Sequence, residues 1–81
     1  MNIERILREP NVTEARGTSR STLWADIKKG LFPHPVRIGP RCVGWPASEV
    51  AAINRAIIAG KSEAEIRELV QRLESARQAA A

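Results

Sequence analysis

The stretch GTSRSTLWADIKKG, residues 17–30, decides the fold of this 81-residue chain. Ser19 is a helix-capping residue type, because its hydroxyl can accept hydrogen bonds from the backbone N–H groups of the following turn. Leu23 and Ile27 then recur four residues apart, which gives the helix an apolar stripe. Gly30 is the kind of residue at which helices end. The stretch therefore predicts a short amphipathic helix.

The residues before this stretch predict a shorter helix. Val12–Arg16 is long enough for about one helical turn, and Gly17 tolerates the left-handed conformation that ends it. Two short helices joined by a tight turn are typical of a helix-turn-helix, whose second helix enters the DNA major groove. Met1–Pro10 is interpreted as a lead-in segment that packs on the core, because Pro10 restrains the residue before it toward extended geometry.

The residues after the stretch predict a β-hairpin. Phe32–Pro35 cannot be helical, since each of its two prolines lacks a donor and pushes the preceding residue to extended geometry. Val36–Ile38 and Arg41–Trp45 show the alternation of strands, and the Gly-Pro pair between them favours a turn. We therefore expect a two-stranded wing that carries Arg37 and Arg41 near its tip and solvent face.

Two further helices are predicted in the second half. Pro46 lies just ahead of a helix that Gly60 ends. Ser62 and Glu65 have the spacing of a capping box, so the last helix should begin at Ser62. Its apolar stripe either pairs with another copy of the chain or folds back on residues 50–58, and both alternatives are open. The stripe consists of Ile66, Leu69, Val70 and Leu73.

The expected fold class is mainly α, with a winged helix-turn-helix domain over residues 1–59 and a C-terminal helical extension over residues 60–81.

The charge of the chain is unevenly distributed: residues 1–46 hold eight Lys or Arg against four Asp or Glu, whereas residues 47–81 hold five of each. A basic first half is the electrostatic footprint of a protein that binds a polyanion. The single cysteine excludes an intramolecular disulfide, and neither a signal peptide nor a membrane span is apparent, so we expect a cytoplasmic protein with no membrane partner.

The predicted DNA contacts lie on the second helix and on the wing. The start of a helix favours phosphate, and Arg20 can read guanine O6 and N7 with two hydrogen bonds. Trp24 is either a core anchor or an exposed platform for DNA, and its place beside Arg20 favours DNA contact. Trp45 is expected to close the core. The predicted DNA-binding set is Ser19, Arg20, Ser21, Thr22, Trp24, Lys28, Arg37 and Arg41.

Signals for chemistry are weak. The sequence GKS at residues 60–62 is similar to the end of a phosphate-binding loop, but Arg55 occupies the position that needs the first glycine. His34 and Cys42 are the only residues of their types, too few for a usual zinc site. No carboxylate lies near His34 in the sequence to orient it as a base for a serine nucleophile. We therefore predict no enzyme activity, no metal and no cofactor.

Several motifs together resemble a known family. The runs GTSRSTLW (17–24), GLFP (30–33), PVRIGPR (35–41) and VGW (43–45), followed by SEV (48–50), resemble the AlpA family of small phage and prophage regulators. This family is related in fold to excisionases and to the DNA-binding domain of MerR-type proteins. The resemblance implies site-specific binding to double-stranded DNA that controls transcription or excision of an integrated element. Thr18 departs from the family, which usually has a larger apolar residue there, and so does the continuation beyond residue 61.

One small module buries little DNA surface, so we expect repeated sites, cooperative binding or a homo-oligomer. An integrase or another recombination protein is a further expected partner. Two alternative functions are open: a DNA-recognition subunit similar to a phage small terminase, and a protein-interaction adaptor whose helix from Ser62 captures a partner.

Overall fold

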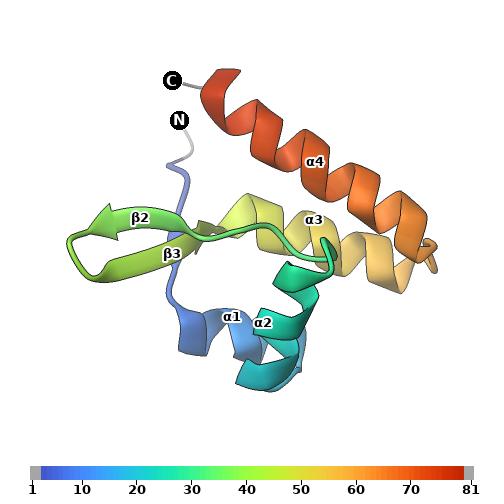
Figure 1. Ribbon diagram of the computed structural model, residues 1–81, viewed down its shortest axis with the longest axis horizontal. Coiled ribbons are helices and arrows are strands. Elements are labelled where there is room, and N and C mark those ends of the chain that lie inside the picture. Colours follow the sequence, from blue (N-terminus) through green and yellow to red (C-terminus); the bar gives the residue numbers. More distant parts are fainter. Residues whose placement is uncertain (1–2, 80–81) are drawn as a thin grey trace.

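The computed structural model describes residues 3–79, which form four helices and a three-stranded antiparallel sheet (Figure 1). The elements in chain order are β1 (Ile6–Leu7), α1 (Glu9–Arg16), α2 (Arg20–Lys28), β2 (Val36–Gly39), β3 (Cys42–Pro46), α3 (Ala47–Ile58) and α4 (Glu63–Ala79). The mainly α fold with a hairpin wing is thus confirmed, and no helix within residues 3–79 is long and apolar enough to cross a membrane.

The turn between α1 and α2 follows from its glycine. Gly17 has a φ of 72°, in the left-handed region that suits a residue without Cβ, and its N–H donates to the carbonyls of Thr13 and Glu14. Ser19 then caps α2, because its Oγ accepts from the N–H of Thr22 at 3.1 Å. Gly30, with a φ of 78°, ends α2 as predicted.

The N-terminal segment does more than lead into the core. Ile6 and Leu7 form a strand that pairs with β3, and α1 begins at Glu9, with Pro10 inside its first turn, where a missing N–H is not needed. The carboxylate of Glu4 accepts hydrogen bonds from the N–H and hydroxyl of Ser48 and so caps α3. Met1 and Asn2, the start of the predicted lead-in, lie outside the described residues.

The sheet has the order β1-β3-β2, so the predicted hairpin carries a third strand at its base. Arg37 of β2 is opposite Val43 of β3, and Leu7 of β1 is opposite Trp45. The three strands meet closely at Gly44, where an added Cβ would lie 2.5 Å from Ile6 Cγ2. A side chain at this position would therefore push β1 away from the hairpin.

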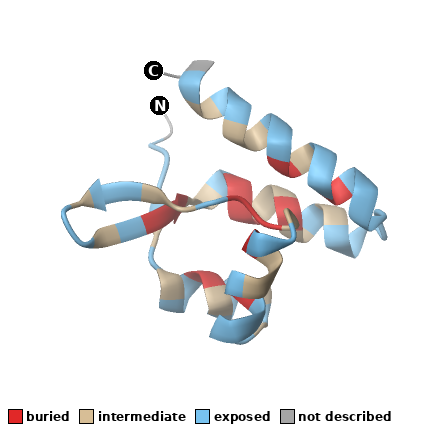
Figure 2. Cartoon of the chain, in the orientation of Figure 1, coloured by how far each residue is buried: buried red, intermediate tan, exposed pale blue. Residues whose placement is uncertain are grey.

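Helix α3 lies in the centre of the molecule, with α1 and α2 on one side and α4 on the other, while the hairpin projects from one end (Figure 1). Buried residues face this centre, and the outer hairpin and the outer surface of α4 are exposed (Figure 2). The single core consists of Val12, Leu23, Ile27, Phe32, Trp45, Val50, Ile53, Ile66 and Val70. Trp45 is fully buried, as predicted.

Candidate nucleic-acid interface

The N-terminus of α2 is open to solvent and is organised by Ser19. The Oγ of Ser19 also donates to Thr22 Oγ1 at 3.0 Å, so the two hydroxyls hold each other in place. Arg20, Ser21 and Thr22 are all exposed. At this end the helix dipole favours an anion, and the first turn of α2 is therefore chemically suited to phosphate.

Three of the predicted contact residues share one face of α2. Arg20, Trp24 and Lys28 follow one another at intervals of four residues, and side chains with that spacing lie above one another on a helix. Arg20 and Lys28 are exposed, whereas Leu23 and Ile27 turn into the core. Helix α2 thus presents a basic stripe to solvent and an apolar stripe to the interior.

Trp24 both contacts the core and is partly exposed to solvent. Its ring meets the buried ring of Trp45 edge to face, with centroids 5.8 Å apart, while 37% of the residue stays exposed. The indole Nε1 donates a 2.6 Å hydrogen bond to Oε2 of Glu9. Trp24 is therefore fixed against Trp45 on one side, while another part of the residue is exposed to solvent.

Glu9 is a member of this cluster that the sequence did not reveal. Its second oxygen, Oε1, lies 3.0 Å from Nε of Arg20, so a single carboxylate holds two residues of α2. The Arg20 side chain is nevertheless 78% exposed, against 25% for Glu9. The guanidinium is therefore held at Nε, while the rest of it extends into solvent.

The wing adds Arg37 to the same side of the molecule. Arg37 pairs with Val43, and Val43 and Trp45 are two residues apart, so strand alternation places all three on one face of the sheet. Since Trp45 contacts Trp24 on that face, the face looks toward α2. Arg41 lies in the turn at the hairpin tip, and both arginines are exposed.

Part of the basic charge of the first half is structural. The side chain of Arg16 is only 5% exposed, is paired with Asp26 at 2.8 Å, and lies over the ring of Phe32 at 4.4 Å. Its guanidinium joins α1 to α2 and to the loop that follows. Arg16 therefore contributes to the core rather than to a surface for a polyanion.

The apolar stripe of α4 follows the second of its two open alternatives. Ile66 and Val70 are buried in the common core, and Leu69 and Leu73 pack against it. The stripe thus packs within the chain. Helix α4, in the predicted extension, therefore supplies part of the core of the preceding domain.

Helix α4 also holds the segment that joins α2 to the wing. Arg67 Nε donates to the carbonyl of Lys29 at 2.9 Å, at the C-terminal end of α2. The carboxylate of Glu74 accepts from the N–H of His34 at 2.7 Å and lies 3.0 Å from its Nδ1. His34 therefore does have a carboxylate partner, although one that lies 40 residues away. Partial burial by itself would raise the pKa of Glu74, but the hydrogen bonds from His34 outweigh it and leave that pKa lowered.

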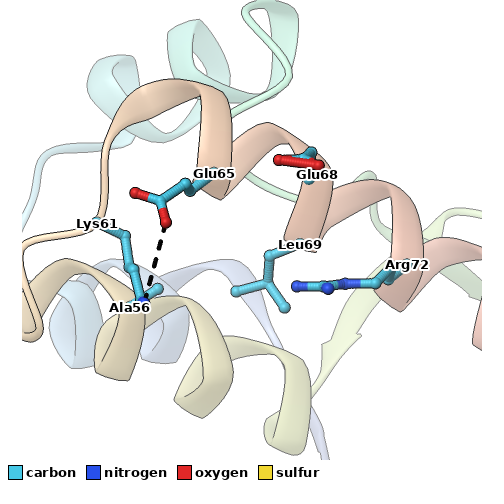
Figure 3. Close-up of a pocket in the computed structure, with 6 residues that line it drawn as sticks. All are labelled: Ala56, Lys61, Glu65, Glu68, Leu69 and Arg72. Atoms are coloured by element: carbon cyan, nitrogen blue, oxygen red, sulfur yellow. Dashed lines mark ion pairs between the residues drawn. The ribbon is translucent and has the colours of Figure 1, made fainter.

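A shallow hollow of about 290 Å³ lies between α3 and α4 (Figure 3). Its polar lining balances two cations, Lys61 and Arg72, against two anions, Glu65 and Glu68, with Lys61 Nζ 4.0 Å from Glu65 Oε2. Such a lining has no net charge to attract a polyanion. Within residues 3–79, no group of three His, Cys, Asp or Glu side chains is placed to hold a metal ion.

Two short helices joined by a tight turn, followed by a β-hairpin and supported by a central helix, define a small winged helix-turn-helix protein. Comparison with known families identifies which one. Residues 5–52 match the family described as "Prophage CP4-57 regulatory protein (AlpA)", and the chain belongs to this family. The match runs from the residue before β1 into α3, so α4 lies beyond it.

A relative from Enterobacteria phage P4, described as "Uncharacterized protein ORF88", is 47% identical to the chain over 58 residues. These residues are 72% of this chain and 66% of the relative, so the chain spans just under two thirds of that protein's length. No solved structure matches the chain.

Proposed function

We propose that this protein binds double-stranded DNA at specific sites and regulates transcription or excision of a phage or another mobile element. The observation that carries the proposal is the basic stripe of α2, Arg20 and Lys28, which lies on the side of the molecule toward which Arg37 of the wing projects. In this proposal α2 enters the major groove, and Arg37 and Arg41 contact the neighbouring backbone or minor groove.

Each predicted residue has a distinct part in the proposal. The first turn of α2, with Ser19, Ser21 and Thr22, would bind phosphate, and Arg20 would contact a base edge. Trp24 would pack on the sugar-phosphate backbone or on a thymine methyl group, and Lys28 would reach a phosphate. Residues 1–59 would carry the DNA-binding surface, and residues 60–81 would hold the α2–wing segment in place.

The description of the family as regulatory favours regulation over a role in DNA packaging. The packing of the apolar stripe of α4 against the core favours DNA binding over the adaptor alternative, since it leaves less apolar surface on that helix for a partner. Because one small module buries little DNA surface, we propose that several copies bind repeated sites and act together with a recombination protein such as an integrase.

The experiment is selection of a preferred duplex from a randomised DNA library, followed by fluorescence anisotropy at several salt concentrations. The proposed contacts include four cationic side chains, and if each neutralises a phosphate, the log-log slope of affinity against salt should be about −4. Lys28→Ala should weaken binding to all duplexes equally and make the slope shallower by about 1, whereas Arg20→Ala should also weaken the preference for the selected sequence.

Arg72→Ala is the matched control, because Arg72 is an exposed arginine on α4, beside the hollow between α3 and α4. It removes the same charge as Arg20→Ala and should leave binding almost unchanged. Failure of the library to yield any preferred sequence would refute the proposed function.

A further inference from the structure

One carboxylate joins the two most distinctive residues of the α2 surface. Glu9 Oε2 accepts a 2.6 Å hydrogen bond from Trp24 Nε1, and Glu9 Oε1 lies 3.0 Å from Arg20 Nε. Glu9 belongs to α1, so this contact connects the first helix of the helix-turn-helix to the exposed face of the second. It lies on the surface where an acidic residue is unfavourable for DNA affinity, since it repels phosphate.

The chemistry of the contact requires a carboxylate. The Trp24 indole N–H donates to Oε2 of Glu9, and the Arg20 guanidinium forms an ion pair with the other oxygen, Oε1. A glutamine has one carbonyl oxygen, and its amide nitrogen is a donor that would face one of the two donors. Position 9, in the first turn of α1, also favours a negative charge because it lies at the positive end of the helix dipole.

The contact leaves the recognising end of Arg20 unused. Glu9 meets Nε, and the Arg20 side chain keeps 78% of its surface exposed. The two terminal nitrogens of a guanidinium are the pair that can bind O6 and N7 of guanine together. A long side chain held at Nε loses less rotamer freedom on binding than a free one, so its preference for one base edge is sharper.

The other end of the contact is fixed by the core. Trp24, which donates to Glu9, packs edge-on against the fully buried Trp45. Trp45 Nε1 in turn donates to the carbonyl of Pro33 at 2.8 Å. The position of the Glu9 carboxylate is thus tied through Trp24 to the rigid interior, and Arg20 is tied to Glu9.

We propose that Glu9 is a specificity-determining positioning residue, which holds Arg20 so that its terminal nitrogens read a guanine in the major groove. This inference rests on the proposed function and deepens it, because it names the residue that positions Arg20 for reading a guanine. The competing role is a purely electrostatic one, in which Glu9 weakens binding to every duplex by the same factor.

The first measurement needs no DNA. In two-dimensional ¹⁵N NMR spectra of the free protein, Glu9→Ala and Glu9→Gln should each move the Trp24 Nε1–H and Arg20 Nε–H signals. The Trp45 indole signal should stay, because its acceptor is Pro33. Glu14→Gln removes the same charge from an exposed position on the same helix and should move none of the three. Unmoved Trp24 and Arg20 signals in both Glu9 variants would overturn the inference.

The second measurement uses the duplex that the wild-type protein selects from the randomised library, and versions in which each guanine is replaced in turn. Glu9→Ala should reduce discrimination at one guanine by about tenfold, within the range for a bidentate arginine contact. Its affinity for an unrelated duplex should be equal to that of the wild type or higher, because a negative charge has been removed. In an Arg20→Ala background, Glu9→Ala should have no further effect on that guanine.

The outcomes separate the two proposals. A gain in affinity that is equal for all duplexes, with the guanine preference intact, would leave the proposed function standing and overturn the role of Glu9. A library that yields no preferred duplex would overturn the proposed function and the reading role of Arg20 together. Thermal unfolding of each variant tests whether it is folded. If Glu9→Ala does not fold, the same measurements are made on Glu9→Gln.

Discussion

Arg77, near the end of α4, binds both carboxylate oxygens of Glu49 in the first turn of α3, with Nε–Oε2 at 2.9 Å and Nη2–Oε1 at 2.6 Å. Glu49 is 5% exposed and is the one charged residue in the buried set of the described chain. Arg77 also donates to the carbonyl of His34 at 2.7 Å. A buried charge of α3 is therefore compensated only while α4 is docked.

Arg77→Ala should lower the free energy of unfolding by about 3 kcal/mol, because it leaves a buried carboxylate without its partner. We take the lower end of the usual range since 22% of the Arg77 side chain is exposed. Urea denaturation measures the effect. Arg72→Ala, an exposed arginine on the same helix, should change stability by less than about 0.5 kcal/mol. Equal effects of the two substitutions would contradict a structural role for the pair.

Ile66→Ala should destabilise the protein by about 2–3 kcal/mol, because Ile66 is 9% exposed and its side chain fills the core between α4 and α3. Ile58→Ala is the matched control, since it deletes the same atoms from a residue that is 84% exposed. Denaturant titration of the two variants, with sedimentation of each, tests the packing. A change in oligomeric state without loss of stability in Ile66→Ala would show that α4 mediates association instead.

Gly44→Ala should separate β1 from the hairpin. The added Cβ would lie 2.5 Å from Ile6 Cγ2 and 2.9 Å from the carbonyl oxygen of Leu7, and the latter is backbone that cannot rotate away. We expect a loss of about 1–3 kcal/mol and faster hydrogen exchange at Ala47, whose N–H donates to the carbonyl of Arg5. Gly39→Ala adds a Cβ no closer than 3.6 Å to its neighbours and should be much better tolerated.

The capping box of α4 predicts a specific dependence on pH. Glu65 accepts a hydrogen bond from the N–H of Ser62 and its own N–H donates to Ser62 Oγ, and these contacts lower the pKa of Glu65 from its ordinary value of 4.5. A lowered pKa in the folded state means that the box stabilises the protein above pH 4.5 and that this contribution is lost as the pH falls through the lowered pKa.

An NMR titration of the Glu65 carboxyl carbon checks this, with a midpoint expected below 4.5 in the wild type. Ser62→Ala should move that midpoint upward, because the hydroxyl that shares the box is gone. Ser48→Ala, which removes a serine hydroxyl near the start of α3, should not move it. A wild-type midpoint at or above 4.5 would contradict the capping box.

The parts of the fold that sequence reasoning predicted are those governed by neighbouring residues. The Ser19 cap, the Gly17 and Gly30 helix ends and the Ser62–Glu65 capping box each depend on a few consecutive positions. The strand β1 is not predictable from the local pattern, because its two residues carry no periodicity and form a strand only by pairing with β3. α1 begins at Glu9, ahead of the predicted Val12, because Pro10 occupies the first turn of the helix instead of extending the backbone.

In the candidate site, too, the features that can be predicted from the sequence are those set by neighbouring residues. The spacing of Arg20, Trp24 and Lys28 was visible in the sequence because a helix repeats every three to four residues. The contacts of Glu9 are not visible in the sequence, because its two partners, Arg20 and Trp24, lie 11 and 15 residues further along the chain. The burial of Arg16 against Phe32 is also invisible in the sequence, because residue type alone does not separate a surface arginine from a buried one. The pairs Glu49–Arg77 and His34–Glu74 join distant segments in the same way.

The hydrogen bond from Trp45 to Pro33 and the edge contact of Trp45 with Trp24 have a mechanical consequence. One buried ring therefore holds the segment before the wing and the exposed helix α2 in a fixed position relative to each other. Under the proposed function, the contacts that α2 and the wing make with a duplex would have a fixed separation, so a base pair inserted between them would carry one contact out of reach.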